Sequence, residues 1–306
     1  MNYKSFLDSV KKEVELQSDK SVNVMLNHII KNNGRELDGI AVMEKDSHIA
    51  PTIYLNGYFE QYKKGRSIKS VAGEVLRLHR QNRDSIRLSS EYFDNYETLK
   101  NVIVYKLINY EKNKKLLSDV PHKRILDLAV VFYCLIDQKK GVSATALIHN
   151  EHLKKWGITE DTLYDDALKN TPVLLKSSIT PMSSLLHEIA KECKDERAAK
   201  VVDEIESDEG IGEEALYVLT NSSRVNGAAC MLYDNLLGSF AEVIHADLYI
   251  LPSSIHEVIL LPKINTFNKS DLLNMVREVN EQGVAEDEVL SDNVYEYNRK
   301  DGVITL

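Results

Sequence analysis

Two histidines three residues apart, His149 and His152, form the most metal-like local cluster in the sequence, with Asn150 and Glu151 between them. Imidazoles at this spacing can share one helix face, but zinc needs three or four ligands in a tetrahedral array. No third ligand stands nearby. We therefore keep His149 and His152 as candidates, commit to no metal and expect no cofactor. In the alternative interpretation, Asn150 caps a helix and the histidines are partly exposed.

The segment 251–262 combines Ser254, His256 and Glu257 between two apolar runs. A serine nucleophile with a histidine base would make a hydrolase, and that chemistry also needs an orienting group and an oxyanion hole. The GxSxG motif that exposes such a serine at a sharp turn is absent. The simpler interpretation is that Pro-Ser-Ser makes a turn and that His256 is a hydrogen-bonded strand residue.

A third candidate is the segment NSSRVNGA, residues 221–228, which leads from a predicted strand into a predicted helix. Backbone amides at the start of a helix can hold an anion, so Asn221, Arg224 and Asn226 are candidate ligand-binding residues. The segment contains one glycine and no Walker motif, so it is not a phosphate loop. Turn and capping roles are the alternative.

Charge is unevenly distributed along the 306 residues. The segment 195–214 contains nine acidic residues and only two basic residues, Arg197 and Lys200. It therefore supplies −7 of the formal net charge of −9. The segment 63–87 contains eight basic residues and only two acidic residues, Glu74 and Asp84. Three aromatic residues come just before its start. Such a face can bind single-stranded nucleic acid, although it can equally be a solvated helix face or a dock for the acidic segment. We expect no nucleic-acid partner.

The composition is that of an ordinary globular protein, with 43% apolar and 28% charged residues. Three widely spaced cysteines without a CxxC motif indicate reduced, buried thiols. No apolar run reaches the 18 residues of a membrane span, and the first twenty residues lack the apolar core of an export signal. These features predict a cytoplasmic protein without a membrane partner.

Hydrophobic periodicity predicts helices and hairpins in irregular alternation. Helices are expected at 3–16, 68–83, 95–117, from 150, from Thr159, through the acidic stretch 194–214, from 226 to about 245, and from Ser270 to Gly283. Strands are expected at 22–31, 36–43, 49–55, 126–136, 143–149, 216–220, 248–251 and 255–261, with a terminal hairpin at 294–306. Pro172 and Pro181 are expected to bracket a short extended link.

This order lacks the regular βαβ alternation of a parallel sheet and favours an α+β fold with antiparallel hairpins and mixed sheets packed against amphipathic helices. The acidic stretch is the best candidate for a boundary. We expect an N-terminal α+β region 1–205, which could divide into 1–118 and 119–205, and a C-terminal α+β region 206–306. A single folding unit is the alternative.

Several blocks of the sequence together carry a resemblance to a protein family. They are IAPTIYLN (49–56), NYEKNKKLLSDVPHKRILDLAVVFY (109–133), NEHLKKWGIT (150–159), NTPVL (170–174), NGAACMLYD (226–234), LPSSIHEVILLP (251–262) and VLSDNVYEY near the end. Nearly the whole chain resembles a family of uncharacterised proteins from anaerobic, often gut-dwelling Firmicutes. The resemblance implies a bacterial cytosolic protein but no established activity, so no catalytic residue is carried over from it.

The leading hypothesis from the sequence is a non-enzymatic binding or adaptor protein that acts through protein–protein contacts. It rests on abundant core and capping sequence, on the lack of an assembled catalytic set and on separated acidic and basic surfaces. The alternatives are a hydrolase-type enzyme that uses the 251–262 hairpin or the His149/His152 pair, and a nucleic-acid binder that uses the 63–87 face. The sequence predicts neither the identity of a partner nor the oligomeric state.

Overall fold

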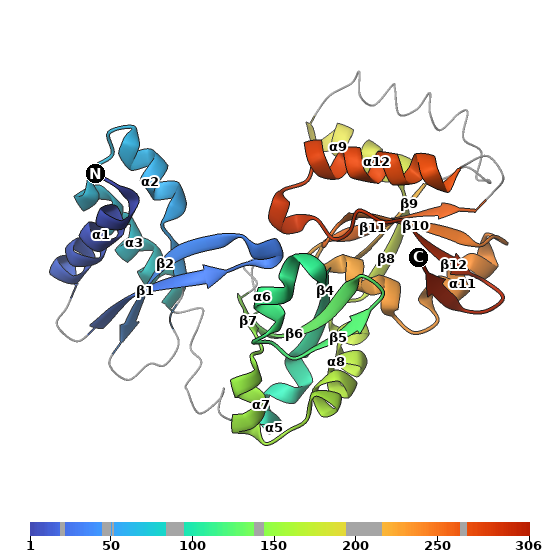
Figure 1. Cartoon of the computed structure of the whole chain (residues 1–306), viewed down its shortest axis with the longest axis horizontal. Coiled ribbons are helices and arrows are strands. Elements are labelled where there is room, and N and C mark those ends of the chain that lie inside the picture. The colour runs from blue at the N-terminus through green and yellow to red at the C-terminus, as the bar shows by residue number, and fades with distance from the viewer. Residues whose placement is uncertain are drawn as a thin grey trace.

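A computed structural model describes residues 1–18, 22–44, 50, 52–83, 95–137, 144–193, 216–263 and 268–306. In these ranges three antiparallel sheets pack with helices (Figure 1), which confirms the predicted α+β class. The sheets have the strand orders β1-β2-β3, β4-β6-β5 with β7 also on β6, and β13-β12-β10-β11-β9-β8. Among the described residues, no helix combines the length and apolar character needed to cross a bilayer.

The N-terminal lobe packs three helices around the three-stranded sheet. Its elements are α1 (Tyr3–Gln17), β1 (Val22–Ile30), β2 (Glu36–Glu44), β3 (Thr52–Tyr54), α2 (Asn56–Lys63) and α3 (Ile68–Arg83). Phe6, Val10 and Val14 recur every four residues on α1 and are fully buried, as their spacing predicts. They join Val71 and Val75 of α3 in a core cluster made only of residues from this lobe.

The β1–β2 hairpin reaches from this lobe to the rest of the molecule (Figure 1). Its nine-residue register runs from Val22↔Glu44 to Ile30↔Glu36. At the tip, Asn33 and Gly34 have φ angles of 57° and 74°, the left-handed conformations that asparagine and glycine tolerate best. The predicted Asn33-Gly34 turn is therefore present at the end of the hairpin that meets the central sheet.

The central part contains the four-stranded sheet. Its elements are α5 (Tyr96–Leu99), β4 (Ile103–Asn109), α6 (Lys114–Leu117), β5 (His122–Ile125), β6 (Leu128–Asp137), β7 (Ala144–Leu147), α7 (Asn150–Trp156) and α8 (Glu160–Leu174). Strand β6 is the centre of the sheet, with β4 on one edge and β5 and β7 on the other. One sheet face packs into the largest core cluster, through Tyr105, Leu107 and Phe132.

The C-terminal part is built on the six-stranded sheet. Its elements are β8 (Ser177–Pro181), α9 (Met182–Cys193), β9 (Tyr217–Asn221), α11 (Leu236–Val243), β10 (Leu248–Ser254), β11 (Glu257–Pro262), α12 (Lys269–Gln282), β12 (Tyr295–Asn298) and β13 (Val303–Thr305). Strands β8 and β9 pair across the predicted boundary near residue 205. The largest core cluster also contains residues from both sides of it, so the division at 205 stays a prediction.

The predicted helix at 95–117 is wrong over most of its length. Residues Ile103–Asn109 form strand β4, flanked by the single turns α5 and α6. Leu99, Ile103 and Leu107 have helical spacing, but the run IVYKLI is apolar on both faces and rich in β-branched residues. A strand that is buried on both faces shows no alternation, so its periodicity does not separate it from a helix.

Two smaller expectations also differ from the structure. Pro172 lies inside the last turn of α8 rather than in an extended link. It removes one i→i−4 hydrogen bond, and only two residues of the helix follow it. The cap of α12 is Asn268, whose side chain accepts from the Ser270 N–H, and not Ser270 itself. The predicted helix through 194–214 lies outside the described residues.

Candidate functional site

The hairpin of β10 and β11 holds the first set of predicted site residues. His256 Nδ1 accepts a hydrogen bond from the Asn226 N–H at 3.1 Å, and its Nε2 lies 3.6 Å from Glu288 Oε1. The Ser254 hydroxyl oxygen accepts from the backbone N–H of His256. Both imidazole nitrogens thus face groups other than a serine hydroxyl, and the geometry resembles turn stabilisation more than a nucleophile with its base. Glu257 accepts from Ser253 at 3.4 Å.

The segment 221–228 is held against that hairpin. The Asn221 side chain is buried and bonds within its own loop, to Val225 O and from the Ser223 N–H. A Cβ on Gly227 would stand 2.5 Å from His256 O, so only glycine fits this approach. Arg224 lies at the surface with Glu188 at 3.5 Å. Asn226 lines a cavity that also contains residues of the central sheet.

The two histidines of the first motif have different surroundings. His149 Nδ1 donates to Asp119 at 2.7 Å, and His152 Nδ1 accepts from the His149 N–H at 2.9 Å. His152 also stacks on Trp156, with ring centroids 5.4 Å apart. The two form a capping box on α7. Within the described ranges, no three His, Cys, Asp or Glu side chains gather as metal ligands would.

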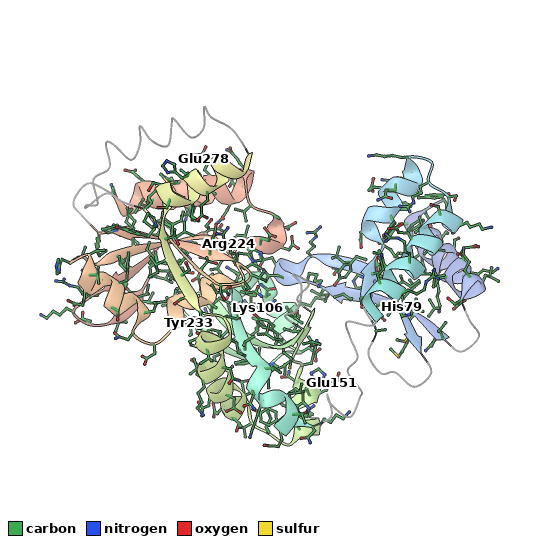
Figure 2. All side chains as sticks on the ribbon, turned by 180° about the vertical axis from the view of Figure 1, so that it is seen from behind. His79, Lys106, Glu151, Arg224, Tyr233 and Glu278 are labelled. Atoms are coloured by element: carbon green, nitrogen blue, oxygen red, sulfur yellow. The ribbon has the colours of Figure 1, made fainter. Side chains whose placement is uncertain are left out.

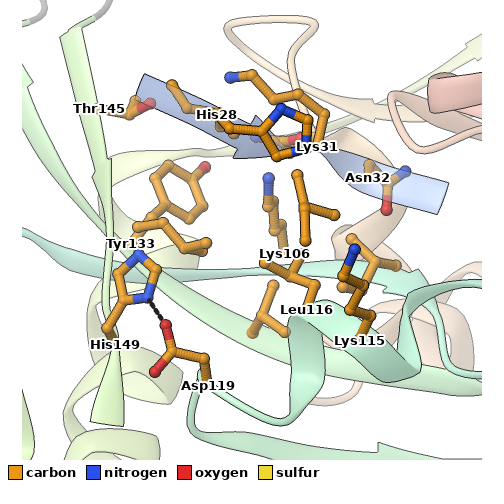
Figure 3. A pocket seen from close by; sticks show the side chains of 16 residues that line it. His28, Lys31, Asn32, Lys106, Lys115, Leu116, Asp119, Tyr133, Thr145 and His149 are labelled. Atoms are coloured by element: carbon orange, nitrogen blue, oxygen red, sulfur yellow. Dashed lines mark hydrogen bonds and ion pairs between the residues drawn. The ribbon is translucent and has the colours of Figure 1, made fainter. Parts of the chain in front are cut away.

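A cavity of about 540 Å³ lies where the β1–β2 hairpin crosses the central sheet, and we call it the hairpin pocket (Figure 3). Its walls come from the hairpin, from β4, β6, β7 and α6, and from the loop after β9. The lining residues are His28, Ile29, Ile30, Lys31, Asn32, Lys106, Ile108, Lys115, Leu116, Asp119, Val131, Tyr133, Thr145, Leu147, His149 and Asn226. The pocket therefore joins His149 and Asn226, which the sequence placed in two separate candidate sites.

Strand alternation explains the floor of the hairpin pocket. Lys106 and Ile108 are two residues apart on β4, and Val131 and Tyr133 are two apart on β6, so each pair shares one face. The register places Lys106 opposite Val131. The intervening Tyr105, Leu107 and Phe132 point to the opposite face and into the core. One sheet thus presents core on one side and the pocket on the other.

Lys106 is the most unusual group in the hairpin pocket. Its side chain rises from the floor toward His28 and Lys31 of the hairpin (Figure 3), and Figure 2 shows it where the hairpin meets the central sheet. Burial, reinforced by repulsion from Lys31, lowers the pKa of Lys106 to about 8. The Tyr133 ring centroid lies 5.9 Å from Nζ. Among the described residues, no carboxylate forms an ion pair with Lys106 or with Lys31.

Other polar groups of the hairpin pocket are already paired. Lys115 Nζ lies 3.1 Å from Glu36 Oε1, and this contact holds the pKa of Glu36 below its ordinary value. Asp119 is the only carboxylate among the described lining residues and accepts from His149. Burial raises the pKa of Tyr133, and a hydrogen bond with Asn226 opposes that rise. Lys31 contacts the Tyr54 ring, with Nζ 4.8 Å from its centroid.

Asparagine side chains fix the hairpin tip over the pocket. Asn33 N–H donates to Asn113 Oδ1 at 2.8 Å, and Asn113 Nδ2 returns a bond to Asn33 Oδ1 at 2.9 Å. Asn33 Nδ2 also donates to Val289 O at 2.7 Å, and Asn32 Nδ2 to Asp287 O at 2.7 Å. Asn113 is 1% exposed. We call these four residues and Val289 the tip clamp; it ties the N-terminal lobe to the other two parts.

The basic face at 63–87 is partly neutralised. Arg66 and Arg77 both contact Glu74, at 3.6 and 2.5 Å, and Lys63 contacts Glu60 at 2.7 Å. These pairs reduce the positive potential available to a phosphate backbone. Residues 84–87 lie outside the described ranges. The exclusion of nucleic acid remains a prediction.

Sequence reasoning missed Lys31, Lys106 and the tip clamp. Lys106 carries a usable signal, because it is the one charged residue in the apolar run 103–108. A lysine inside a buried strand must find a counterion, a cavity or a lowered pKa. The signal was lost when the run was interpreted as a helix, whose polar face would place that lysine in solvent.

The fold and the pocket define the class: an α+β protein of three antiparallel sheets with a cation-containing cavity between an N-terminal hairpin and the central sheet. The chain belongs to the family described as Family of unknown function (DUF5688), whose model matches residues 3–299. This match confirms the predicted membership of a family without an established activity. No curated protein and no solved structure matches the chain.

Proposed function

We propose that this protein binds a small anionic molecule in the hairpin pocket. The observation that carries the proposal is that Lys31 and Lys106 both line one cavity, near enough for Lys31 to lower the pKa of Lys106, without a carboxylate partner among the described residues. Their mutual repulsion and the burial of Lys106 cost folding free energy when no anion is bound. An anion between them would offset both costs, because it supplies an opposite charge.

The size and lining of the cavity support this proposal. A volume of about 540 Å³ lies within the range of small-molecule sites, which are mostly apolar with a few convergent polar groups. Here Ile29, Leu116 and Leu147 supply apolar wall, while Asn32 and Asn226 offer amide groups beside the two lysines. The carboxylate of Asp119 would repel an anion, but it already accepts a hydrogen bond from His149.

Isothermal titration calorimetry with inorganic phosphate, pyrophosphate and citrate tests the proposal. At least one of these anions should bind, and Lys106→Met and Lys31→Met should each weaken it about tenfold or more, the effect of losing one charge-assisted hydrogen bond. The matched control is Lys114→Met, which removes the same charge from α6 at a lysine that pairs with Glu111 outside the pocket. Equal affinity in all four proteins would sink the proposal.

The proposal keeps the binding-protein hypothesis from the sequence but assigns it a small ligand. A protein partner stays a separate prediction, and native mass spectrometry distinguishes the two: extra mass of a few hundred daltons that disappears on denaturation supports the small ligand. A cytoplasmic location belongs to the same proposal. The buried free thiols of Cys134 and Cys230 suit a reducing compartment.

A further inference from the structure

The proposed anion site contains an amine whose surroundings suit covalent chemistry. We propose that Lys106 forms a reversible imine with the carbonyl group of an anionic aldehyde or ketone held in the hairpin pocket. This inference rests on the proposed function and deepens it by naming the substrate class: a small molecule that carries both a carbonyl and an anionic group.

The Lys106 amine is positioned to meet a ligand in the cavity. Lys106 Nζ projects from the floor into the cavity rather than along the sheet surface (Figure 3), and no carboxylate among the described residues holds it in the ammonium form. Ile108, two residues along β4, and Val131, the register partner of Lys106 on β6, place apolar side chains on the same sheet face. An amine in such a place is partly neutral at mild pH, and only the neutral amine has the electron pair that attacks a carbonyl.

Other cations of the hairpin pocket can bind the anionic end of a ligand. Lys31 enters from the hairpin and Lys115 from α6, so two ammonium groups on other elements can hold the anionic end of a ligand. Lys106 is then available to meet the carbonyl end. Glu36 competes for Lys115, whereas Lys31 has only the weaker contact with the Tyr54 ring to give up, so Lys31 is the principal anion contact.

The pocket also contains a group that can accept and donate protons. His149 Nδ1 donates to Asp119 at 2.7 Å, so a carboxylate orients an imidazole that lines the same cavity as Lys106. Figure 3 shows the His149 ring beside Tyr133 in the same cavity. The charged or titratable groups that face Lys106 are thus His28 and Lys31 from the hairpin, Lys115, Asp119, Tyr133 and His149.

The reaction is balanced without an oxidant or a reductant. The Lys106 nitrogen bonds to the carbonyl carbon, the carbon–oxygen double bond breaks in two stages, and the oxygen leaves as water with the two protons that the amine loses. His149 can accept the first proton and return it to the departing hydroxyl group. Hydrolysis reverses every step, so the product is a bound adduct that an external reductant can trap.

Pyridoxal 5′-phosphate with sodium cyanoborohydride, followed by intact mass measurement and peptide mapping, tests the inference. At pH 8 about 100-fold more of an amine with a pKa near 8 is neutral than of an ordinary lysine, so Lys106 should be labelled at least about tenfold faster than any exposed lysine. The wild type and Lys114→Met should carry one adduct on Lys106. Lys106→Met and Lys106→Arg should lose it.

Pyridoxine 5′-phosphate, which has an alcohol in place of the aldehyde, separates this inference from the proposed function. Binding of this alcohol together with labelling spread evenly over exposed lysines would overturn the imine and leave the anion site standing. Labelling at Lys106 without binding of the alcohol would support the imine and overturn the anion site. Lys106→Arg supplies a folding control, because it keeps the charge and should still bind the alcohol.

Discussion

The hairpin pocket and the β10–β11 hairpin contain the same kinds of residue but use them differently. Around His256, each polar group has a protein partner: Asn226 and Glu288 face the ring, and Ser254 accepts from the backbone. In the pocket, Lys31 and Lys106 line one cavity and repel each other, with no carboxylate partner among the described residues. A satisfied network stabilises the fold, whereas an unsatisfied pair of charges costs free energy and so favours the binding of an opposite charge.

The largest expected effect is a gain of stability from destroying the proposed site. Lys106→Met should raise the free energy of unfolding of the ligand-free protein at pH 7 by about 3 kcal/mol, because the pKa of Lys106 falls from 10.5 to about 8 on folding and each pKa unit corresponds to about 1.4 kcal/mol. Denaturant unfolding followed by circular dichroism measures the difference. A variant less stable than the wild type would show that Lys106 has a counterion.

The pH dependence of that gain has a definite sign. The folded pKa of Lys106 is about 8 and its ordinary value is 10.5, so between these values the unfolded chain binds the proton and the folded chain does not. Wild-type stability therefore rises with pH in this window relative to Lys106→Met. The difference in free energy of unfolding between Lys106→Met and the wild type should have its full size below about pH 8 and should disappear as pH approaches 10.5.

The tip clamp should give the next largest effect. Asn113→Ala leaves the half-buried Asn33 N–H without its acceptor, which should cost about 1–2 kcal/mol of stability. It should also weaken anion binding, because the clamp holds the hairpin that carries Lys31. Calorimetry and thermal unfolding measure the two effects, and Asn23→Ala, at an exposed hairpin position, is the control. Full affinity in Asn113→Ala would show that the tip does not need the clamp.

How far the sequence predicts this arrangement depends on whether a pattern is local. The α1 stripe, the Asn33-Gly34 turn and the Thr159 cap follow from neighbouring residues, and all three are present. The hairpin pocket joins residues from 28 to 226, and their proximity depends on which sheet face meets which hairpin. His149 and Asn226 were therefore identified singly but not as one site. Lys106 was missed because the residues of β4 were interpreted as a helix, which would have placed this lysine in solvent.

His256→Ala tests the other side of the comparison. The substitution leaves the Asn226 N–H without its acceptor, so it should lower stability by about 1–2 kcal/mol. Since neither Lys31 nor Lys106 is touched, anion affinity should change by less than about threefold, or under about 0.7 kcal/mol. The reverse outcome, unchanged stability with lost anion affinity, would show that His256 belongs to the anion site. The hairpin pocket and the β10–β11 hairpin would then form a single site.

The smallest expected effect is on the titration of Lys106 in Lys31→Met. Repulsion from Lys31 is the second cause of the lowered pKa, after burial, so removing that charge should raise the pKa of Lys106 only part of the way to its ordinary value. NMR of a chain labelled with ¹⁵N-lysine, or the pH profile of the trapping reaction, reports this change. An unchanged pKa would mean that Lys31 and Lys106 do not share the cavity closely enough to hold one anion. A small rise of the Lys106 pKa in Lys31→Met, with none in Lys114→Met, would support the contact that distinguishes the pocket from the satisfied hairpin.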